Sequence, residues 1–462
     1  MRKNFRNVLG FASAPLPPRE GIYHYLIKND LEKTRVHLRI DQDNSGTLLV
    51  NAKYVYHLNP TAAYIAYLYM NHVPDYVAIK GITKHYLINQ KQALNDFKTI
   101  TNQIKELISP LGACPICDLN LDIISPFSQT PSAPYRMDLA LTYKCNNSCL
   151  HCYNDKSRGF KELTKDQWID IIDSLWHIGI PHIIFTGGEP TLFPDLADLI
   201  SHTENNGQIT GINTNGRKLK DKDYINKLID AGLDHIQITI ESHDQNIHDS
   251  MVGCKGAFEE TVSGIKNAVE SDLYVMTNTT MLKPNISNIE DTLNFLSDLG
   301  VKTVGLNALI YSGRGLEVNT GIKETELPSL LHKVQDIISN NNQRLIWYTP
   351  TQYCHFDPIQ MELGVKGCTA ALYNMCIEPD GSVIPCQSYY ESIGNIIDND
   401  WNSIWNHPLA KSLRNRSDVP EKCKKCSIFS ICGGGCPLAR KAGKIAPPIP
   451  QDPLLEEMEY IK

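Results

Sequence analysis

The chain has 462 residues, of which 42% are hydrophobic and 21% are charged. This length exceeds that of a typical domain, so we expect two or three domains with sizeable apolar cores rather than extended disorder. The net charge of −7 argues against nucleic acid as the main partner. The sequence has no apolar run long enough to span a membrane, so no membrane partner is expected either.

Cysteine is the unusual part of the composition. The chain has 14 cysteines, although it is too long to need disulfide bonds for its stability. The apolar stretch near its start, residues 8–12, is too short for the core of a signal peptide. We therefore expect a reducing, cytoplasmic location, where clustered cysteines are typical of metal sites or catalytic thiols.

Residues 1–20 are predicted to form an N-terminal tail, and residues 21–110 a small domain of strands and helices. β-Branched and aromatic patterns predict two strands and then a hairpin, at residues 22–27, 36–40 and 47–59. Helices are predicted from Pro60 and at residues 75–86 and 90–108. An exposed edge of this sheet would suit an extended peptide that adds as a further strand.

Residues 111–135 are rich in proline and serine and are predicted to be a linker. They contain Cys114 and Cys117, spaced C-x₂-C. Such a pair is typical of half a zinc or cluster site, or of a redox couple. The alternative is that both are ordinary thiols in a linker.

Residues 136–344 alternate between strand and helix patterns. Strands are predicted at residues 136–143, 182–188, 209–215, 235–241, 274–282 and 303–309, and helices at 165–179, 195–207, 223–232, 258–272 and 288–300. This alternation predicts an α/β fold, a partial (β/α)₆ TIM-type barrel with its functional groups at the carboxyl ends of the strands. Residues 345–462 have few regular patterns and many cysteines, which predicts a loop-rich domain held together by metal.

Three cysteines follow the first predicted barrel strand. Cys145, Cys149 and Cys152 are spaced C-x₃-C-x₂-C. Because a structural zinc site takes four ligands, three close thiolates favour an iron–sulfur cluster with one open iron, which can bind a small molecule. The alternative is a zinc site completed by His151 or by a distant residue.

A second motif, GGEP at residues 187–190, follows the second barrel strand, where glycines let backbone groups approach a ligand. The two motifs in this order resemble the radical S-adenosylmethionine (SAM) superfamily. The resemblance implies a [4Fe–4S] cluster on the catalytic cysteines Cys145, Cys149 and Cys152, with SAM chelated by the open iron. An electron from a donor such as flavodoxin or ferredoxin would then cleave SAM to methionine and a 5′-deoxyadenosyl radical, which takes a hydrogen atom from the substrate.

The same resemblance assigns further residues to the binding of SAM. Adenine would contact His151 and Tyr153, and the methionine amine would be received by Gly187, Gly188, Glu189 and Pro190. Later strand ends that resemble family motifs contribute Asn213, Asn215, Thr239 and Glu241, and a Gly-Arg-Gly motif lies at residues 313–315. The family's arginine in HD-x-x-R is replaced by Val252, and Lys255 is the candidate substitute.

The C-terminal cysteines form two arrays. Cys423, Cys426, Cys432 and Cys436 are spaced C-x₂-C-x₅-C-x₃-C, and the upstream array is spaced C-x₁₂-G-x₄-C from Cys368 to Cys386. The arrays resemble the SPASM extension of radical SAM peptide-modifying enzymes, which holds auxiliary [4Fe–4S] clusters. The resemblance implies one auxiliary cluster on Cys368, Cys376, Cys386 and Cys436, and three corners of a second on Cys423, Cys426 and Cys432.

The second auxiliary cluster is one thiolate short, because no cysteine follows Cys436. Three options stay open: a carboxylate ligand from the tail (Asp452, Glu456 or Glu457), an open iron that binds substrate, or only one complete auxiliary cluster. Cys354 is a less favoured source of the missing thiolate. Cys254 is interpreted as an ordinary loop thiol.

The order of elements in residues 21–110, with the LNPTAA turn at residues 58–63, resembles the winged-helix-like PqqD-like domain. Such domains bind the leader of a precursor peptide by strand addition. The three domains together resemble maturases that install a C–C, C–S or related crosslink, or another oxidative change, in a precursor peptide or protein. The alternatives are a SPASM-type maturase of a folded enzyme or its cofactor (formylglycine, quinone or metallocofactor maturation) and a non-enzymatic metal-binding or peptide-carrier protein.

Overall fold

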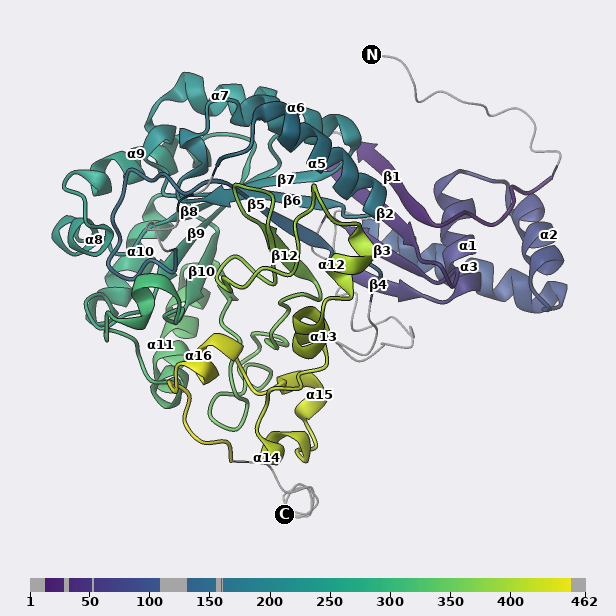
Figure 1. Ribbon diagram of the computed structural model, residues 1–462. Coiled ribbons are helices and arrows are strands. Elements are labelled where there is room, and N and C mark those ends of the chain that lie inside the picture. The colour runs from purple at the N-terminus through teal and green to yellow at the C-terminus, as the bar shows by residue number, and fades with distance from the viewer. Residues whose placement is uncertain are drawn as a thin grey trace. The chain divides into compact units, whose positions relative to one another are not determined.

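Figure 1 shows the computed structural model of the protein, which describes residues 13–28, 33–51, 54–108, 131–154, 159 and 161–449. The chain forms two compact units, one of residues 1–124 with 175–181 and one of residues 125–174 with 182–462. The predictions for Cys114 and Cys117, and for the tail carboxylates beyond residue 450, lie outside the described residues.

Within the described residues, the first unit has a four-stranded antiparallel sheet followed by three helices, as the sequence predicts. The strands are β1 (Gly21–Lys28), β2 (Lys33–Ile40), β3 (Gly46–Val50) and β4 (Tyr54–Leu58), in the order β1-β2-β3-β4. The helices are α1 (Pro60–Met70), α2 (Asp75–His85) and α3 (Gln90–Ile108). Asn59 caps α1 by accepting the Ala62 amide at 2.9 Å, and Pro60 suits the first helical position, where an N–H has no helical partner.

One apolar cluster joins this sheet to its helices. Val36, Leu38 and Leu48 of the strands are buried against Ala63 and Ala66 of α1. Strands β1 and β4 are the edges of the sheet, each paired on one side only among the described residues. The unit therefore offers edge strands of the kind that strand addition requires.

The second unit is built on six parallel strands in chain order. They are β5 (Arg136–Thr142), β6 (His182–Gly187), β7 (Ile209–Thr214), β8 (His235–Thr239), β9 (Tyr274–Thr280) and β10 (Thr303–Asn307). The helices between them include α5 (Lys165–Ile178), α6 (Leu196–Asn206), α7 (Lys222–Asp230), α9 (Ala257–Val269) and α10 (Ile289–Asp298). This confirms the predicted mixed α/β fold with a partial (β/α)₆ barrel.

Burial on both faces explains why these strands pair in parallel. Leu139, Phe185 and Ile212 are fully buried, and β5 and β10 are buried along nearly their whole length. Figure 1 shows the helices that follow the strands lying along the outside of the sheet. All six carboxyl ends therefore meet at one edge, where the segments after β5, β6, β7 and β8 come together.

The structure also contains elements that the sequence patterns did not indicate. These are α8 (Gln245–Val252), α11 (Leu327–Asn340), β11 (Arg344–Trp347), β12 (Asn374–Ile377) and β13 (Val383–Ile384). The sheet of this unit thus has nine strands, in the order β11-β10-β9-β8-β7-β6-β5-β12-β13. Strand β12 pairs in parallel with β5 and sets Cys376 opposite Asp138, so the cysteine-rich region is joined directly to the barrel.

The remainder of the C-terminal region is irregular, as predicted, and carries five short helices. They are α12 (Trp401–Trp405), α13 (Pro408–Arg414), α14 (Glu421–Lys424), α15 (Phe429–Cys432) and α16 (Pro437–Lys441). Across the described ranges, no helix has both the length and the apolar character needed to cross a membrane.

Candidate functional site

The loop that carries Cys145, Cys149 and Cys152 follows β5 and is held against the end of α8. The Ser148 amide donates to the Val252 carbonyl at 2.8 Å. Gly253, with a φ of 62°, ends α8 beside the loop, and a Cβ there would lie 2.5 Å from the Ser148 carbonyl oxygen. Helix α8, which the sequence patterns did not indicate, thus determines the path of the loop.

The three thiols of this loop fit an iron–sulfur cluster by their chemistry. All three are partly exposed. Burial raises the pKa of the Cys149 thiol, and the neighbouring thiols of Cys152 and Cys145 raise it further. Such thiols need a nearby positive charge in order to ionise, and iron supplies it. Within the described ranges no three His, Cys, Asp or Glu side chains are placed to hold a single metal ion, whereas a four-iron cluster keeps its thiolates farther apart.

The GGEP segment lies beside this loop because its glycines permit contact between backbones. The Gly188 amide donates to the Thr142 carbonyl at 2.7 Å. A Cβ at Gly187 would lie 2.2 Å from the Thr142 carbonyl oxygen, and one at Gly188 would lie 2.4 Å from that of Lys144. The described contacts with the end of β5 therefore explain why both positions are glycine. The sequence suggested a further reason, the approach of a ligand.

The Glu189 side chain binds other parts of the protein. Its Oε1 accepts the Thr191 amide at 3.1 Å and the hydroxyls of Thr191 and Thr214 at 2.7 and 2.6 Å. Its Oε2 accepts the Asn215 amide at 2.8 Å. Burial raises the pKa of Glu189, and these four donors oppose the rise. Glu189 therefore ties the segment after β6 to the segment after β7 and acts as a positioning residue.

Two of the predicted SAM contacts bind each other. His151 Nε2 and Glu241 Oε1 are 3.0 Å apart, and Glu241 Oε2 accepts the Thr280 amide at 3.0 Å. The pair therefore joins the segments after β5, β8 and β9. Asn213 and Thr239 lie near the ends of β7 and β8, at the same edge of the sheet.

Arg217 holds the cysteine loop from the other side and was missed by the sequence analysis. Its Nη1 donates to the Asn146 carbonyl at 2.6 Å and to Asn147 Oδ1 at 2.8 Å. Its Nε donates to Glu260 Oε2 at 2.6 Å. The signal that could have found it is its position directly after the Asn-Thr-Asn-Gly motif, two of whose residues were predicted to contact SAM.

Arg314, from the Gly-Arg-Gly motif, also contacts the cysteine loop. Its Nη1 donates to the carbonyl oxygen and the hydroxyl of Ser148, both at 3.2 Å. Its Nη2 is buried and has no hydrogen-bond partner among the residues that the structure describes. A buried guanidinium with a spare N–H suits a carboxylate. Lys255, the substitute suggested by the sequence, is exposed, and its contact with the SAM carboxylate stays a prediction.

Buried tyrosines connect the cysteine loop with Cys376. Tyr153 interacts electrostatically with Cys376 and Tyr390, and burial raises its pKa. Tyr390 Oη donates to Asn154 Oδ1 at 3.0 Å, and its ring lies edge-on to Tyr143 with centroids 6.5 Å apart. Tyr143 and Tyr390 pack around Cys376, which is 1% exposed. The aromatic cluster thus lies between the first cysteine loop and the first auxiliary array.

The four cysteines assigned to the first auxiliary cluster are neighbours. Cys368, Cys386 and Cys436 interact electrostatically with one another, and Cys376 interacts with Cys386. Burial raises the pKa of Cys368 and Cys386 to about 12. Two backbone amides donate toward the Cys386 sulfur and two toward that of Cys436. Buried sulfurs that accept N–H bonds are a feature of iron–sulfur sites, so the donor set fits such a cluster.

The three cysteines assigned to the second auxiliary cluster line one pocket. Cys423 interacts electrostatically with both Cys432 and Cys426. Cys432 Sγ accepts the Gly434 amide at 3.4 Å. The structure therefore brings together the three thiols that the spacing in the sequence assigned to one cluster.

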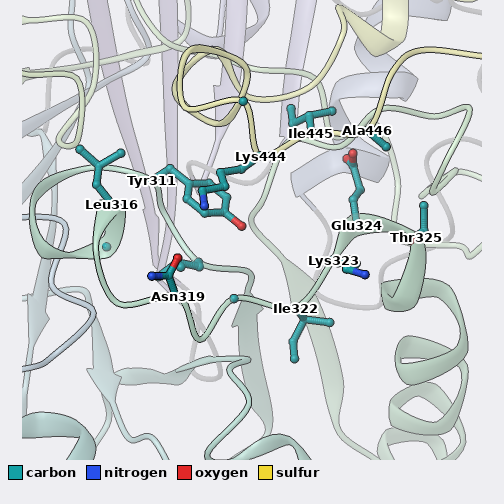
Figure 2. A pocket seen from close by; sticks show the side chains of 14 residues that line it. Tyr311, Leu316, Asn319, Ile322, Lys323, Glu324, Thr325, Lys444, Ile445 and Ala446 are labelled. Atoms are coloured by element: carbon teal, nitrogen blue, oxygen red, sulfur yellow. The ribbon is translucent and has the colours of Figure 1, made fainter.

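A pocket of about 380 Å³ lies at the carboxyl end of β10 (Figure 2). It is formed by residues 309–325 and 443–446, and Figure 2 shows Tyr311, Asn319 and Lys323 around it. Its volume is within the range of small-molecule sites. Gly315 is on its wall, and a Cβ there would lie 3.5 Å from the His151 carbonyl oxygen, so the pocket borders the first cysteine loop.

Glu324 is the acidic group of this pocket. Its Oε1 accepts the Gln352 amide at 2.6 Å, and its Oε2 is buried without a partner in the described segments. Burial raises the pKa of Glu324 to about 7, and the Gln352 N–H bond opposes the rise. The pocket therefore carries a carboxyl group that can exist in either protonation state near neutral pH.

Comparison with known families agrees with this geometry. Residues 139–296 match the radical SAM superfamily. Residues 368–427 match the SPASM family, an iron–sulfur cluster-binding domain. The two matches cover the cysteine loop after β5 and most of the C-terminal arrays.

Individual proteins show the same likeness. The chain is 27% identical over 320 residues to the AdoMet-dependent heme synthase of Methanosarcina barkeri, across 66% of this chain and 91% of that protein. It is 27% identical over 322 residues to the PqqA peptide cyclase of Bradyrhizobium diazoefficiens, across 67% of this chain and 83% of that protein. The crystal structure of Streptococcus suis SuiB bound to precursor peptide SuiA has a TM-score of 0.67 and 17% identity, across 88% of this chain and 95% of SuiB.

The partial barrel, with a cysteine loop at its carboxyl edge and cysteine arrays beyond it, defines an iron–sulfur enzyme of the SAM-dependent class. The chain contains a radical SAM domain at residues 139–296 and an iron–sulfur cluster-binding SPASM domain at residues 368–427. Its cofactors are therefore SAM and [4Fe–4S] clusters.

Proposed function

We propose that this enzyme is a peptide maturase that oxidatively modifies, for example crosslinks, a leader-bound precursor peptide. The extent of the likeness to SuiB carries the proposal. Residues 136–462 are less than three quarters of the chain, so a match over 88% of it includes part of the first unit. SuiB is a protein whose crystal structure was determined with a bound precursor peptide.

The chain's own residues have distinct roles in this proposal. Cys145, Cys149 and Cys152 hold the catalytic cluster, which together with SAM supplies a 5′-deoxyadenosyl radical that takes a hydrogen atom from the peptide. Arg314 presents its buried N–H to the SAM carboxylate. The His151–Glu241 pair holds together the segments that would surround SAM.

The substrate would be held at two places. We assign residues 21–110 to leader recognition, with an edge strand of its sheet as the docking site. Residues 111–135 are the linker, residues 136–344 the radical SAM core and residues 345–462 the SPASM region. The pocket that contains Tyr311 and Glu324 borders the cysteine loop and is large enough for one side chain of the peptide core.

The proposal also includes an electron donor of the flavodoxin or ferredoxin class and a reducing, cytoplasmic location. The support is the match of the cysteine-rich region to an iron–sulfur cluster-binding domain, whose ligands are reduced thiols. Their use as cluster ligands requires a compartment in which disulfides do not compete.

A second function is favoured by the heme synthase relative. That match would suit a maturase of a cofactor or of a folded enzyme. It covers 66% of the chain, however, whereas the likeness to SuiB covers 88%. We therefore rank it below the peptide maturase.

Co-expression with a short peptide encoded beside the gene tests the proposal. Mass spectrometry should show loss of hydrogen from the peptide, and a Cys145→Ala, Cys149→Ala, Cys152→Ala variant should leave the peptide unchanged. Deletion of residues 1–110 should weaken peptide binding while uncoupled cleavage of SAM continues. Unaltered peptides in all pairings, or peptide affinity that survives the deletion, would contradict the function proposed.

A further inference from the structure

The second auxiliary array lacks a fourth thiolate in the downstream sequence, but the structure places one beside it from upstream. The segment Thr351–Cys354 lies between β11 and Cys368 in the chain. The pocket lined by Cys423, Cys426 and Cys432 is also lined by Cys354. One cavity therefore contains four thiols, the number that a fully ligated [4Fe–4S] cluster takes.

Direct contacts hold this segment against the array. The Tyr353 amide donates to Cys432 Sγ at 3.4 Å, and Cys432 Sγ lies 3.9 Å from the Thr351 carbonyl oxygen. Gln352 Nε2 donates to the Gly434 carbonyl at 3.5 Å. Residues 351, 352 and 353 are each 3% exposed or less. Because the residues before it are buried and bonded to the array, Cys354 cannot move far from the other three thiols.

The surroundings of the Cys354 sulfur resemble those of the Cys432 sulfur. Cys354 interacts electrostatically with Cys426, and both Cys423 and Cys432 interact with Cys354. Its Sγ accepts the Ile449 amide at 3.4 Å, as Cys432 Sγ accepts backbone amides. Backbone N–H donors to sulfur suit a cluster thiolate.

Cys254, the other cysteine without a motif, has different surroundings. Arg217 Nη1 donates to its sulfur at 3.3 Å, beside the catalytic loop and not in the four-thiol pocket. It therefore provides a matched control for any experiment on Cys354.

We propose that Cys354 is the fourth ligand of the second auxiliary cluster, together with Cys423, Cys426 and Cys432. The ligand set then begins upstream of the SPASM motif instead of ending downstream of it. A cluster with four thiolates has no open iron, so this centre would transfer electrons and would not bind substrate. The inference concerns the cofactor and is independent of which substrate the enzyme modifies.

Iron content tests the proposal in full-length protein reconstituted with iron and sulfide. The Cys145→Ala, Cys149→Ala, Cys152→Ala variant removes the catalytic cluster and should retain about eight irons per chain in two auxiliary clusters. Adding Cys254→Ala should change nothing. Adding Cys354→Ala should lower the iron to about four per chain, or to about seven with the electron paramagnetic resonance signal of an oxidised three-iron cluster.

Two results would overturn the proposal. One is an unchanged iron content and spectrum in the Cys354→Ala protein. The other is a background protein with only about four irons, because it would have no second cluster for Cys354 to ligate. Neither result depends on peptide turnover, so failure here is distinguishable from failure of the proposed function.

Alkylation of the wild-type protein gives a test that does not depend on how a variant folds. Iodoacetamide labelling and peptide mass spectrometry are applied to the reconstituted protein and to protein stripped of iron by a chelator. Cys354 should react at least about tenfold more slowly in the reconstituted protein, because a ligated thiolate is not free to attack. Cys254 should react at the same rate in both. Equal rates for Cys354 in the two states would rule out its ligation.

Discussion

Replacement of Glu189 by glutamine tests whether its carboxylate organises the SAM-binding edge of the barrel. The carboxylate accepts four hydrogen bonds and donates none. The glutamine amide has nearly the same shape, but one of its two polar ends is a donor. With Oε1 kept as the acceptor for Thr191 and Thr214, the new NH₂ group faces the Asn215 amide, which is also a donor.

The magnitude follows from these contacts. The Asn215 amide loses its acceptor in a buried site, which costs about 1–3 kcal/mol. The three bonds to Oε1 change from charge-assisted to neutral, and each loses about 1 kcal/mol or less. Because neutral glutamine is also easier to bury than a carboxylate, part of this loss is offset. We expect Glu189→Gln to destabilise the second unit by about 3–5 kcal/mol, or about 6–10 °C in apparent melting temperature.

The assay is thermal unfolding at a fixed scan rate, combined with equilibrium dialysis of SAM. Glu162→Gln is the matched control, since Glu162 also accepts from a threonine hydroxyl and an amine (Thr142 and Lys144) but its side chain is 30% exposed. A partly exposed carboxylate of this kind should contribute about 1 kcal/mol or less. SAM affinity should fall for Glu189→Gln and stay unchanged for the control.

The reasoning would be refuted if the two variants melted at the same temperature as the wild type. That result would mean that the Glu189 side chain is already protonated in the folded enzyme, so that a neutral amide replaces it at no cost. It would also remove the argument that Glu189 holds the segments after β6 and β7 together.

Three further perturbations test other parts of the site. Gly188→Ala would place a Cβ 2.4 Å from a backbone carbonyl oxygen and should cost about 1–3 kcal/mol and weaken SAM binding in dialysis, whereas Gly159→Ala, with no atom within 4 Å, should not. Arg217→Ala removes three hydrogen bonds to the cysteine loop and to Glu260, and should lower the free energy of unfolding by about 2–4 kcal/mol. The catalytic cluster of this variant should lose its iron to a chelator faster than that of the wild type. An unchanged rate of iron loss would contradict the role of Arg217. Burial lowers the pKa of His235 to about 4, so only the unfolded chain gains this proton as the pH falls from 6.5 toward 4. The contribution of His235 to the free energy of unfolding should be fully present above pH 6.5 and should fall by up to about 2 kcal/mol at pH 5. His235→Gln should reduce the pH dependence of the melting temperature.

The barrel could be predicted because the residue patterns of its strands and helices are local in the sequence. Each strand from β5 to β10 is a short buried apolar run, and each is separated from the next by a helical pattern. Strand β12 could not be found in this way. It is four residues long, has no distinctive period, and forms only because β5 offers an unpaired neighbour more than 200 residues earlier in the chain.

The candidate site shows the same division. Spacing identified Cys145, Cys149 and Cys152, because ligands of one cluster lie close together in the chain. Spacing also led to Glu189 as a SAM contact, which stays a prediction, whereas the structure adds that its carboxylate accepts hydrogen bonds from Thr191, Thr214 and Asn215. The residue type and position were informative, whereas the partner of the side chain depended on how neighbouring strand ends fold together.

The sequence by itself determined the class of chemistry, since ten of the fourteen cysteines lie in three motifs whose spacing is typical of iron–sulfur clusters. It also determined the order of the domains, because strand and helix periods are local properties. The tertiary structure alone decided which distant groups meet. It joined the cysteine-rich region to the barrel through β12 and put Cys354 beside an array that begins 69 residues later. Contacts of this kind depend on chain packing, and no spacing in the sequence records them.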